Sequence, residues 1–129
     1  MSESILVVDD NADNRDLTQI LLENEGFEVR QAEDAAQALG MLGSYRPNLI
    51  LMDVQLPGID GLELTRRLRQ DPSLQGVIIV ALSAYAMAAE KENAKAAGCD
   101  GYITKPINTR TFASVVMQYL AGPNADTPR

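Results

Sequence analysis

Three aspartates, a serine and a lysine each follow a short apolar segment in this 129-residue sequence. Asp9 and Asp10 end "ILVVDD", Asp53 ends "LILMD", Ser83 ends "VIIVALS" and Lys105 ends "GYITK". A single aspartate at such a place is often only a turn residue, because its side chain binds backbone groups two residues further on. Reactive side chains that recur at the same place in four segments instead predict one shared site.

The chemistry of these residues points to a metal ion and a phosphoryl group. Two carboxylates about 4 Å apart repel each other by roughly 4 kcal/mol at an effective dielectric constant near 20, so a proton or a cation must accompany them. Mg²⁺ suits this role because it prefers carboxylates, waters and phosphate oxygens, and the sequence has no histidine and only one cysteine, Cys99, for a softer metal. Asp53 could then attack phosphorus, while Lys105 and Ser83 bind phosphoryl oxygens.

Five segments have the pattern of β-strands that could position these residues. Segments 4–9, 48–53 and 76–83 are nearly continuous apolar runs, which are typical of strands covered on both faces of a parallel sheet. Segments 27–32 and 101–105 alternate apolar and polar residues, which predicts half-exposed strands at the two edges.

Helices are predicted between the strands from apolar residues at helical spacing. The predicted apolar faces are Leu17, Ile20, Leu21 and Asn24; Ala35, Ala38, Leu39 and Leu42; Leu64 and Leu68; and Phe112, Val115, Val116 and Tyr119. Asn108 is predicted to be the N-cap of the last of these helices. A further helix, the fourth in chain order, is predicted around residues 87–97; it is mostly alanine with charges, so it has little apolar area to anchor it.

The alternation of five strands with five helices predicts an α/β fold, a doubly wound parallel sheet of flavodoxin-like order 2-1-3-4-5. We expect one domain over residues 1–121 and a flexible polar tail over 122–129. Ligands bind such sheets at the carboxyl ends of the strands, where the strand order reverses. Asp9, Asp10 and Asp53 are predicted to meet there, facing Ser83 and Lys105.

Composition narrows the function further. The chain has 11 lysines and arginines against 18 aspartates and glutamates, and this net charge of −7 argues against nucleic-acid binding. The absence of histidine removes histidine-dependent catalysis and a role as a phosphohistidine carrier. Neither a signal peptide nor an apolar run of membrane-spanning length is present, so we expect a cytoplasmic protein with protein partners and no membrane association.

Four motifs, "ILVVDD", "LILMDVQLPGIDGLEL", "VIIVALSAYA" and "GYITKPI", resemble in order and spacing the receiver domain of two-component response regulators. The resemblance covers residues 4–120 and implies that Asp53 accepts a phosphoryl group from the phosphohistidine of a sensor histidine kinase or a histidine phosphotransfer protein. It also implies that Mg²⁺ is bound by Asp10, Asp53 and the backbone carbonyl of Gln55, with Asp9 acting through water.

The resemblance assigns further roles. Ser83 takes the place of the family's switch hydroxyl, Lys105 that of its lysine, and Tyr102 that of its rotating aromatic residue. The Lys105–Pro106 bond resembles the family's cis peptide, and Gln55 and Tyr85 occupy positions that adjust the lifetime of the acyl phosphate. Phosphorylation is expected to change the surface of the fourth helix, fifth strand and fifth helix, over residues 86–119, which would contact a downstream protein target.

Several functions compete. A stand-alone switch that catalyses only its own phosphorylation and dephosphorylation is expected, because only a short tail follows the fifth helix; a receiver domain excised from a hybrid histidine kinase shares the same chemistry. A metal-dependent aspartyl phosphatase is disfavoured because Gln55 stands where such enzymes place a second aspartate. A flavodoxin-like cofactor binder is disfavoured because the loop "DDNADN" is acidic and lacks glycine. Tyr102 could simply be an aromatic residue suited to an edge strand.

Overall fold

A computed structural model describes residues 3–56, 58–84 and 87–121 of the chain. The predicted tail and Tyr85 lie outside these residues. The elements, in chain order, are β1 Ser4–Val8, α1 Ala12–Glu23, β2 Glu28–Ala32, α2 Ala35–Leu42, β3 Leu49–Asp53, α3 Gly61–Arg69, a 3₁₀ turn Pro72–Leu74, β4 Ile78–Ser83, α4 Ala88–Ala97, β5 Gly101–Thr104 and α5 Phe112–Leu120. Within the described residues, every helix is too short or too polar to cross a membrane.

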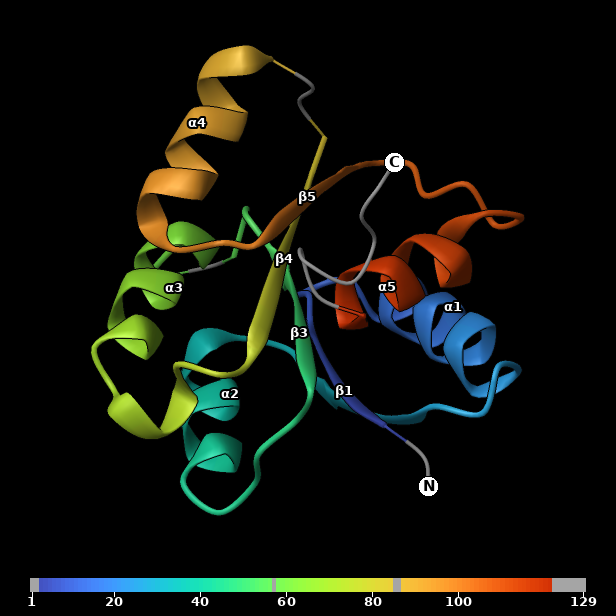
Figure 1. The fold of residues 1–129 in the computed structure, drawn as a ribbon, viewed down its shortest axis with the longest axis horizontal. Coiled ribbons are helices and arrows are strands. Elements are labelled where there is room, and N and C mark those ends of the chain that lie inside the picture. Colours follow the sequence, from blue (N-terminus) through green and yellow to red (C-terminus); the bar gives the residue numbers. More distant parts are fainter. Residues whose placement is uncertain (1–2, 57, 85–86, 122–129) are drawn as a thin grey trace.

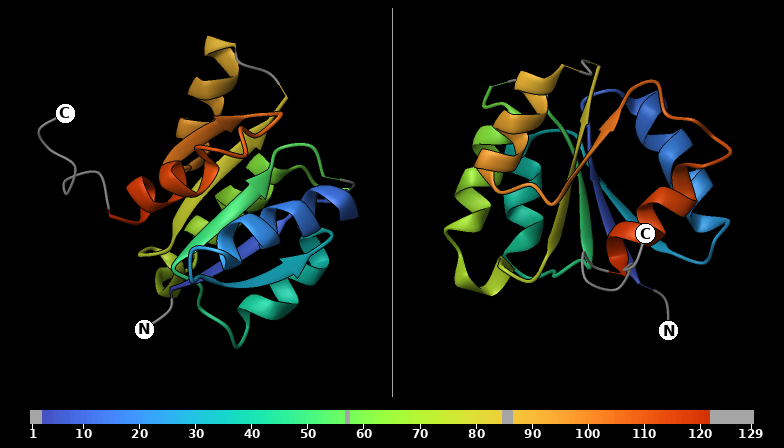
Figure 2. Two further views of the ribbon diagram at one scale, coloured as in Figure 1. Left: turned by 90° about the vertical axis from the view of Figure 1, so that its right-hand side faces the viewer. Right: turned by 45° about the horizontal axis from the view of Figure 1, so that its top comes forward.

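The five strands form one parallel sheet in the order β2-β1-β3-β4-β5, as the sequence predicts. The helices cover both faces of this sheet: α1 and α5 lie on one face, and α2, α3 and α4 lie on the other (Figures 1 and 2). The alternating segments β2 and β5 are the two edge strands, and the continuous apolar strands β1, β3 and β4 lie between them. The fold therefore brings the carboxyl ends of β1 and β3 side by side.

The central strands bury both of their faces. Leu6 and Val8 of β1 belong to the core that also contains residues of α2 and α3, whereas Ile5 and Val7 belong to the core shared with α5. All five residues of β3 are buried, including the terminal Asp53. Strand β3 is therefore held rigidly on both sides up to the residue at which chemistry is predicted.

The predicted apolar face of α1 is wrong at Leu17, Ile20 and Asn24, which are exposed, and only Leu21 of this set packs against the core. Leu17 and Ile20 are 40% and 57% exposed, whereas Thr18 and Leu22 are buried. Apolar residues at 17, 20, 21 and 22 surround most of the helix, so their spacing does not select one face. The buried Thr18 has no hydrophobic signal in the sequence, and packing against the sheet selects the face that contains it.

Two further helix predictions need correction. Leu39 is exposed at the rim of a hollow between α2 and α3, whereas Ala35, Ala38 and Leu42 of this short helix are buried in the core. Asn108 is not the N-cap of α5, since its carbonyl and side chain close a turn before the helix begins. The N-cap is Thr111, which makes no side-chain capping bond.

The alanine-rich helix α4 is anchored weakly, as its composition predicts. Only Ala94 and Ala97 of this helix are buried. Its N-cap, Met87, makes no side-chain capping bond and is 65% exposed. The helix ends at Gly98 in a left-handed conformation with φ of 111°. Little apolar area therefore opposes a shift of the N-terminal half of α4.

Candidate functional site

Three carboxylates meet at the carboxyl ends of β1 and β3. Asp9 and Asp10 follow β1, Asp53 ends β3, and one carboxylate oxygen of each lies within 4.8 Å of the others. Asp9 and Asp53 are only 2% and 3% exposed, whereas Asp10 faces solvent. The acidic cluster that the sequence predicts thus forms where the strand order reverses, and its Asp10 side is exposed to solvent.

The two buried carboxylates are held in the same way. Asp9 Oδ1 accepts a hydrogen bond from the backbone N–H of Asn11 at 2.9 Å, and Asp53 Oδ1 accepts one from the N–H of Gln55 at 3.0 Å. Each side chain thereby closes the turn that follows its own strand. One oxygen of each carboxylate is held by local backbone, which leaves the second oxygen to interact across the site.

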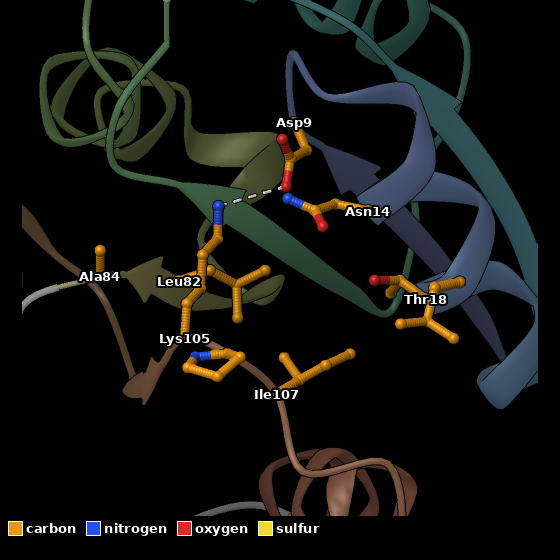
Figure 3. Close-up of a pocket in the computed structure, with 9 residues that line it drawn as sticks. Asp9, Asn14, Thr18, Leu82, Ala84, Lys105 and Ile107 are labelled. Carbon is orange, nitrogen blue, oxygen red and sulfur yellow. Dashed lines mark hydrogen bonds and ion pairs between the residues drawn. The ribbon is translucent and has the colours of Figure 1, made fainter.

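Lys105 bridges these second oxygens. Its Nζ lies 3.1 Å from Asp53 Oδ2 and 3.4 Å from Asp9 Oδ2, and Figure 3 shows the lysine side chain extending toward Asp9. The Lys105 backbone N–H donates to the Ser83 carbonyl at 2.7 Å, and the Lys105–Pro106 peptide is cis, as the family resemblance implies. The ammonium group of Lys105 therefore reaches Asp53 from the end of β5, which is two strands away from β3 in the sheet.

Asp53 resists ionisation in this environment. Burial, and secondarily the neighbouring Asp9 carboxylate, raise the pKa of Asp53, while the hydrogen bond from Gln55 and the charge of Lys105 oppose the rise. A cation bound among the carboxylates would favour the ionised form. The donor set fits Mg²⁺, because three hard carboxylate oxygens lie close enough together to share one small ion.

The raised pKa of Asp53 leads to a prediction about stability. A folded-state pKa above 3.8 means that the folded protein holds this proton more tightly than the unfolded chain, so stability falls as pH rises from the ordinary value through the raised one. Asp53→Asn should remove this loss and raise the free energy of unfolding at pH 7, because the asparagine side chain carries no charge that burial disfavours.

Urea denaturation at pH 4 and pH 7, without divalent cations, measures this effect. Glu92→Gln, which removes an exposed charge from α4, is the matched control and should change stability little at either pH. An Asp53→Asn variant less stable than the wild type at pH 7 would contradict the proposed cost of the buried charge.

The remaining predicted residues take different positions. Ser83 is buried at the end of β4, one residue beyond the position that pairs with Asp53. Gln55 is exposed in the turn after Asp53, and its carbonyl remains a predicted ligand. Tyr102 is half-buried in β5 and packs with the small apolar cluster under α4 that contains Ala81 and Ala94.

Sequence reasoning missed two residues that touch the site's backbone. A side-chain Cβ at Gly61 would lie 2.1 Å from the Asp53 carbonyl oxygen, so α3 can begin here only with glycine. Arg15 of α1 donates from Nη1 to the Asp9 carbonyl at 2.7 Å. The "DG" of "PGIDG" indicates a turn before a helix, yet nothing in the sequence signals either close approach.

A hollow of about 320 Å³ opens beside Lys105. It is bounded by α1 and by the loop that follows β5, and Thr18 and Ile107 are among the residues that line it (Figure 3). Leu17 of α1 also lines it. Asp9 and Lys105 also line this hollow. A side chain of another molecule placed in the hollow would therefore have apolar walls and a charged pair beside it.

Comparison with known proteins gives a consistent result. Residues 5–117 match the family model of the response regulator receiver domain. The polar-differentiation response regulator DivK of Brucella anthropi is 38% identical over 120 residues, which are 93% of this chain and 98% of DivK. A solved structure of a putative response regulator from Chloroflexus aurantiacus superposes with a TM-score of 0.89 at 31% identity, covering 94% of this chain and 99% of that one. Chemotaxis response regulator CheY4 of Vibrio cholerae gives 0.87 at 28%, covering 93% and 99%.

Proposed function

Because the chain belongs to the response regulator receiver domain family, we propose that it is a Mg²⁺-dependent phosphorylation switch in which Asp53 accepts the phosphoryl group. The observation that carries this proposal is the grouping of Asp9, Asp10 and Asp53 with Lys105 at one edge of the sheet. A stand-alone role is supported by the DivK relative, which matches this chain over 98% of its own length.

In the proposed reaction, a carboxylate oxygen of Asp53 attacks the phosphorus of a partner's phosphohistidine. The new O–P bond forms as the N–P bond breaks, and the departing imidazole nitrogen takes up a proton. Lys105 and Ser83 would bind phosphoryl oxygens, and the buried walls of the site would hold Asp53 in line. Asp10, Asp53 and the backbone carbonyl of Gln55 would hold Mg²⁺, and Asp9 would act through water. The bound ion would supply positive charge that neutralises the carboxylates and the phosphoryl oxygens.

The proposed phosphodonor is a sensor histidine kinase or a histidine phosphotransfer protein. The hollow beside Lys105 and the exposed Leu17 and Ile20 of α1 offer such a protein an apolar surface next to the site. The net charge of −7 disfavours a nucleic-acid partner, and we propose that the exchange takes place in the cytoplasm without a membrane.

We propose that the phosphorylated state is read by a downstream protein through the face formed by α4, β5 and α5. A phosphoryl group at Asp53 would attract the Ser83 hydroxyl, and Tyr102 would turn toward the space that this movement vacates. The weak anchoring of α4 supports this helix as the part that moves. Backbone amide shifts over residues 88–119 should therefore change on phosphorylation, and unchanged shifts there would contradict this output face.

Intact-mass measurement after incubation with Mg²⁺ and a small phosphodonor, such as acetyl phosphate, tests the proposed function. The wild type should gain one phosphoryl group, the gain should disappear when the metal is chelated, and Asp53→Asn should gain none. A gain that does not depend on the metal, or no gain in the wild type, would contradict the proposal.

A further inference from the structure

We propose that Arg15 is a positioning residue for the acidic site, which orients the loop carrying Asp9 and Asp10 and thereby increases its affinity for Mg²⁺. This inference rests on the proposed function, since it concerns the same metal site. Arg15 lies on α1, outside the set of residues that the family resemblance assigns to the site, and its side chain is half-buried.

The guanidinium group of Arg15 connects the site loop to the edge strand. Its Nη1 donates to the Asp9 carbonyl at 2.7 Å, and its Nε donates to Gln31 Oε1 at 2.9 Å. The planar guanidinium presents these two donors at a fixed angle, so the position of Gln31 constrains the position of Nη1.

Gln31 is itself held in place. Its Nε2 donates to Gln19 Oε1 at 2.5 Å and to Asp16 Oδ1 at 3.2 Å, and both acceptors belong to α1. Arg15 and Gln31 therefore take part in a network that ties α1 to β2 beside the site. A side chain supported at several points loses less freedom when it holds a third group than a mobile surface arginine would.

The bond to the Asp9 carbonyl acts on Asp10 through the backbone. The β1–β2 ladder pairs Val8 with Ala32, and the Asp9 N–H still donates to the Ala32 carbonyl at 3.1 Å. The Asp9 carbonyl belongs to the planar peptide unit that leads to Asp10. By binding this oxygen, Arg15 fixes the orientation of the peptide unit between Asp9 and Asp10, and so constrains the position of the exposed Asp10.

Positioning and simple charge predict opposite results when Arg15 is replaced. A guanidinium beside the carboxylates repels a divalent cation, so a pure charge effect would make Mg²⁺ bind more tightly to Arg15→Met. Loss of orientation should instead weaken binding, as removal of outer partners of metal ligands commonly does by roughly ten-fold or more. Arg15→Lys separates the two effects, because it keeps the charge and loses the second donor direction.

The experiment is a Mg²⁺ titration of the unphosphorylated full chain, followed by the backbone amide shifts of Asp10 and Asn11. We expect roughly ten-fold weaker binding for Arg15→Met, an intermediate loss for Arg15→Lys, and a smaller loss for Gln31→Leu, which removes only the support of the guanidinium. Thermal unfolding of each variant shows whether it is folded at the temperature of the titration, so that weaker binding is not mistaken for unfolding.

Arg69→Met is the matched control. Arg69 also donates to backbone carbonyls, at 2.9 Å to Gly98 and 2.8 Å to Val77. These contacts lie near the start of β4, whereas the acidic site lies at the carboxyl ends of the strands. This variant should lower stability and leave Mg²⁺ affinity unchanged. Arg15 variants that bind Mg²⁺ as tightly as the wild type, or more tightly, would overturn this inference alone. A wild type that binds no Mg²⁺ would overturn it together with the proposed function.

Discussion

Replacing Gly61 with alanine should lower the free energy of unfolding by about 3 kcal/mol, at the upper end of the usual cost of overpacking, and should abolish an ordered site at Asp53. The new Cβ would lie 2.1 Å from the Asp53 carbonyl oxygen and 2.9 Å from its carbonyl carbon. Both atoms are backbone at the end of a fully buried strand, so neither can move aside as a flexible side chain would. The Gly61 N–H also donates to the Val54 carbonyl at 2.8 Å, which ties the start of α3 to the same turn.

Urea denaturation of Gly61→Ala beside Gly76→Ala tests this prediction. A Cβ at the exposed Gly76 would meet no atom within 4 Å, so its replacement should be neutral or slightly stabilising. Gly61→Ala should also take up less phosphoryl group under conditions in which it remains folded. If Gly61→Ala equals the wild type in stability and phosphorylation, the close approach of α3 to Asp53 does not constrain the site.

Replacing Lys105 with methionine should lower the free energy of unfolding at neutral pH by about 3 kcal/mol, because it removes one partner from buried charges. The Lys105 ammonium lies 3.1 Å and 3.4 Å from oxygens of Asp53 and Asp9, both of which are almost fully buried. Methionine keeps most of the aliphatic chain and removes the charge. The pKa of Asp53 should rise further, since Lys105 is among the groups that lower it.

The contribution of the charge can be separated from that of packing. Lys95→Met makes the same change at an exposed position of α4 and should leave stability nearly unchanged. Mg²⁺ should recover part of the loss in Lys105→Met by compensating the same carboxylates. Combining Lys105→Met with Asp53→Asn should cost less stability than the two separate effects predict, because loss of the lysine then leaves one buried carboxylate fewer without a partner. Additive effects would show that Lys105 and Asp53 do not interact.

The sequence was sufficient to predict the sheet and the ends of its strands. Buried strands such as β1 and β3 are continuous apolar runs, so a charged residue that ends such a run is conspicuous. Parallel strands place these endings along one edge, and the strand order then brings Asp9, Asp10 and Asp53 together. Lys105 and Ser83 could be placed at the same edge by the same reasoning, because each follows or ends a strand.

The features that could not be predicted depend on tertiary contacts. The burial of Thr18 in place of Leu17 follows from how α1 packs on the sheet, and helical spacing alone leaves that choice open. The close approach of Gly61 and the reach of Arg15 join segments whose separation in space no local pattern records. Gly61 and Arg15 therefore support the acidic cluster from outside, whereas Asp9, Asp10, Asp53 and Lys105 lie within it.

The most direct test of the proposed switch is to identify the residue that carries the phosphoryl group. Borohydride reduces an aspartyl phosphate to homoserine and leaves free carboxylates unchanged, so peptide mapping by mass spectrometry locates the modified position. After incubation with Mg²⁺ and a small phosphodonor, we predict homoserine at position 53 and unmodified residues at Asp9 and Asp10. Homoserine at position 9 or 10, or none at position 53, would contradict the assignment of Asp53 as the phosphoacceptor.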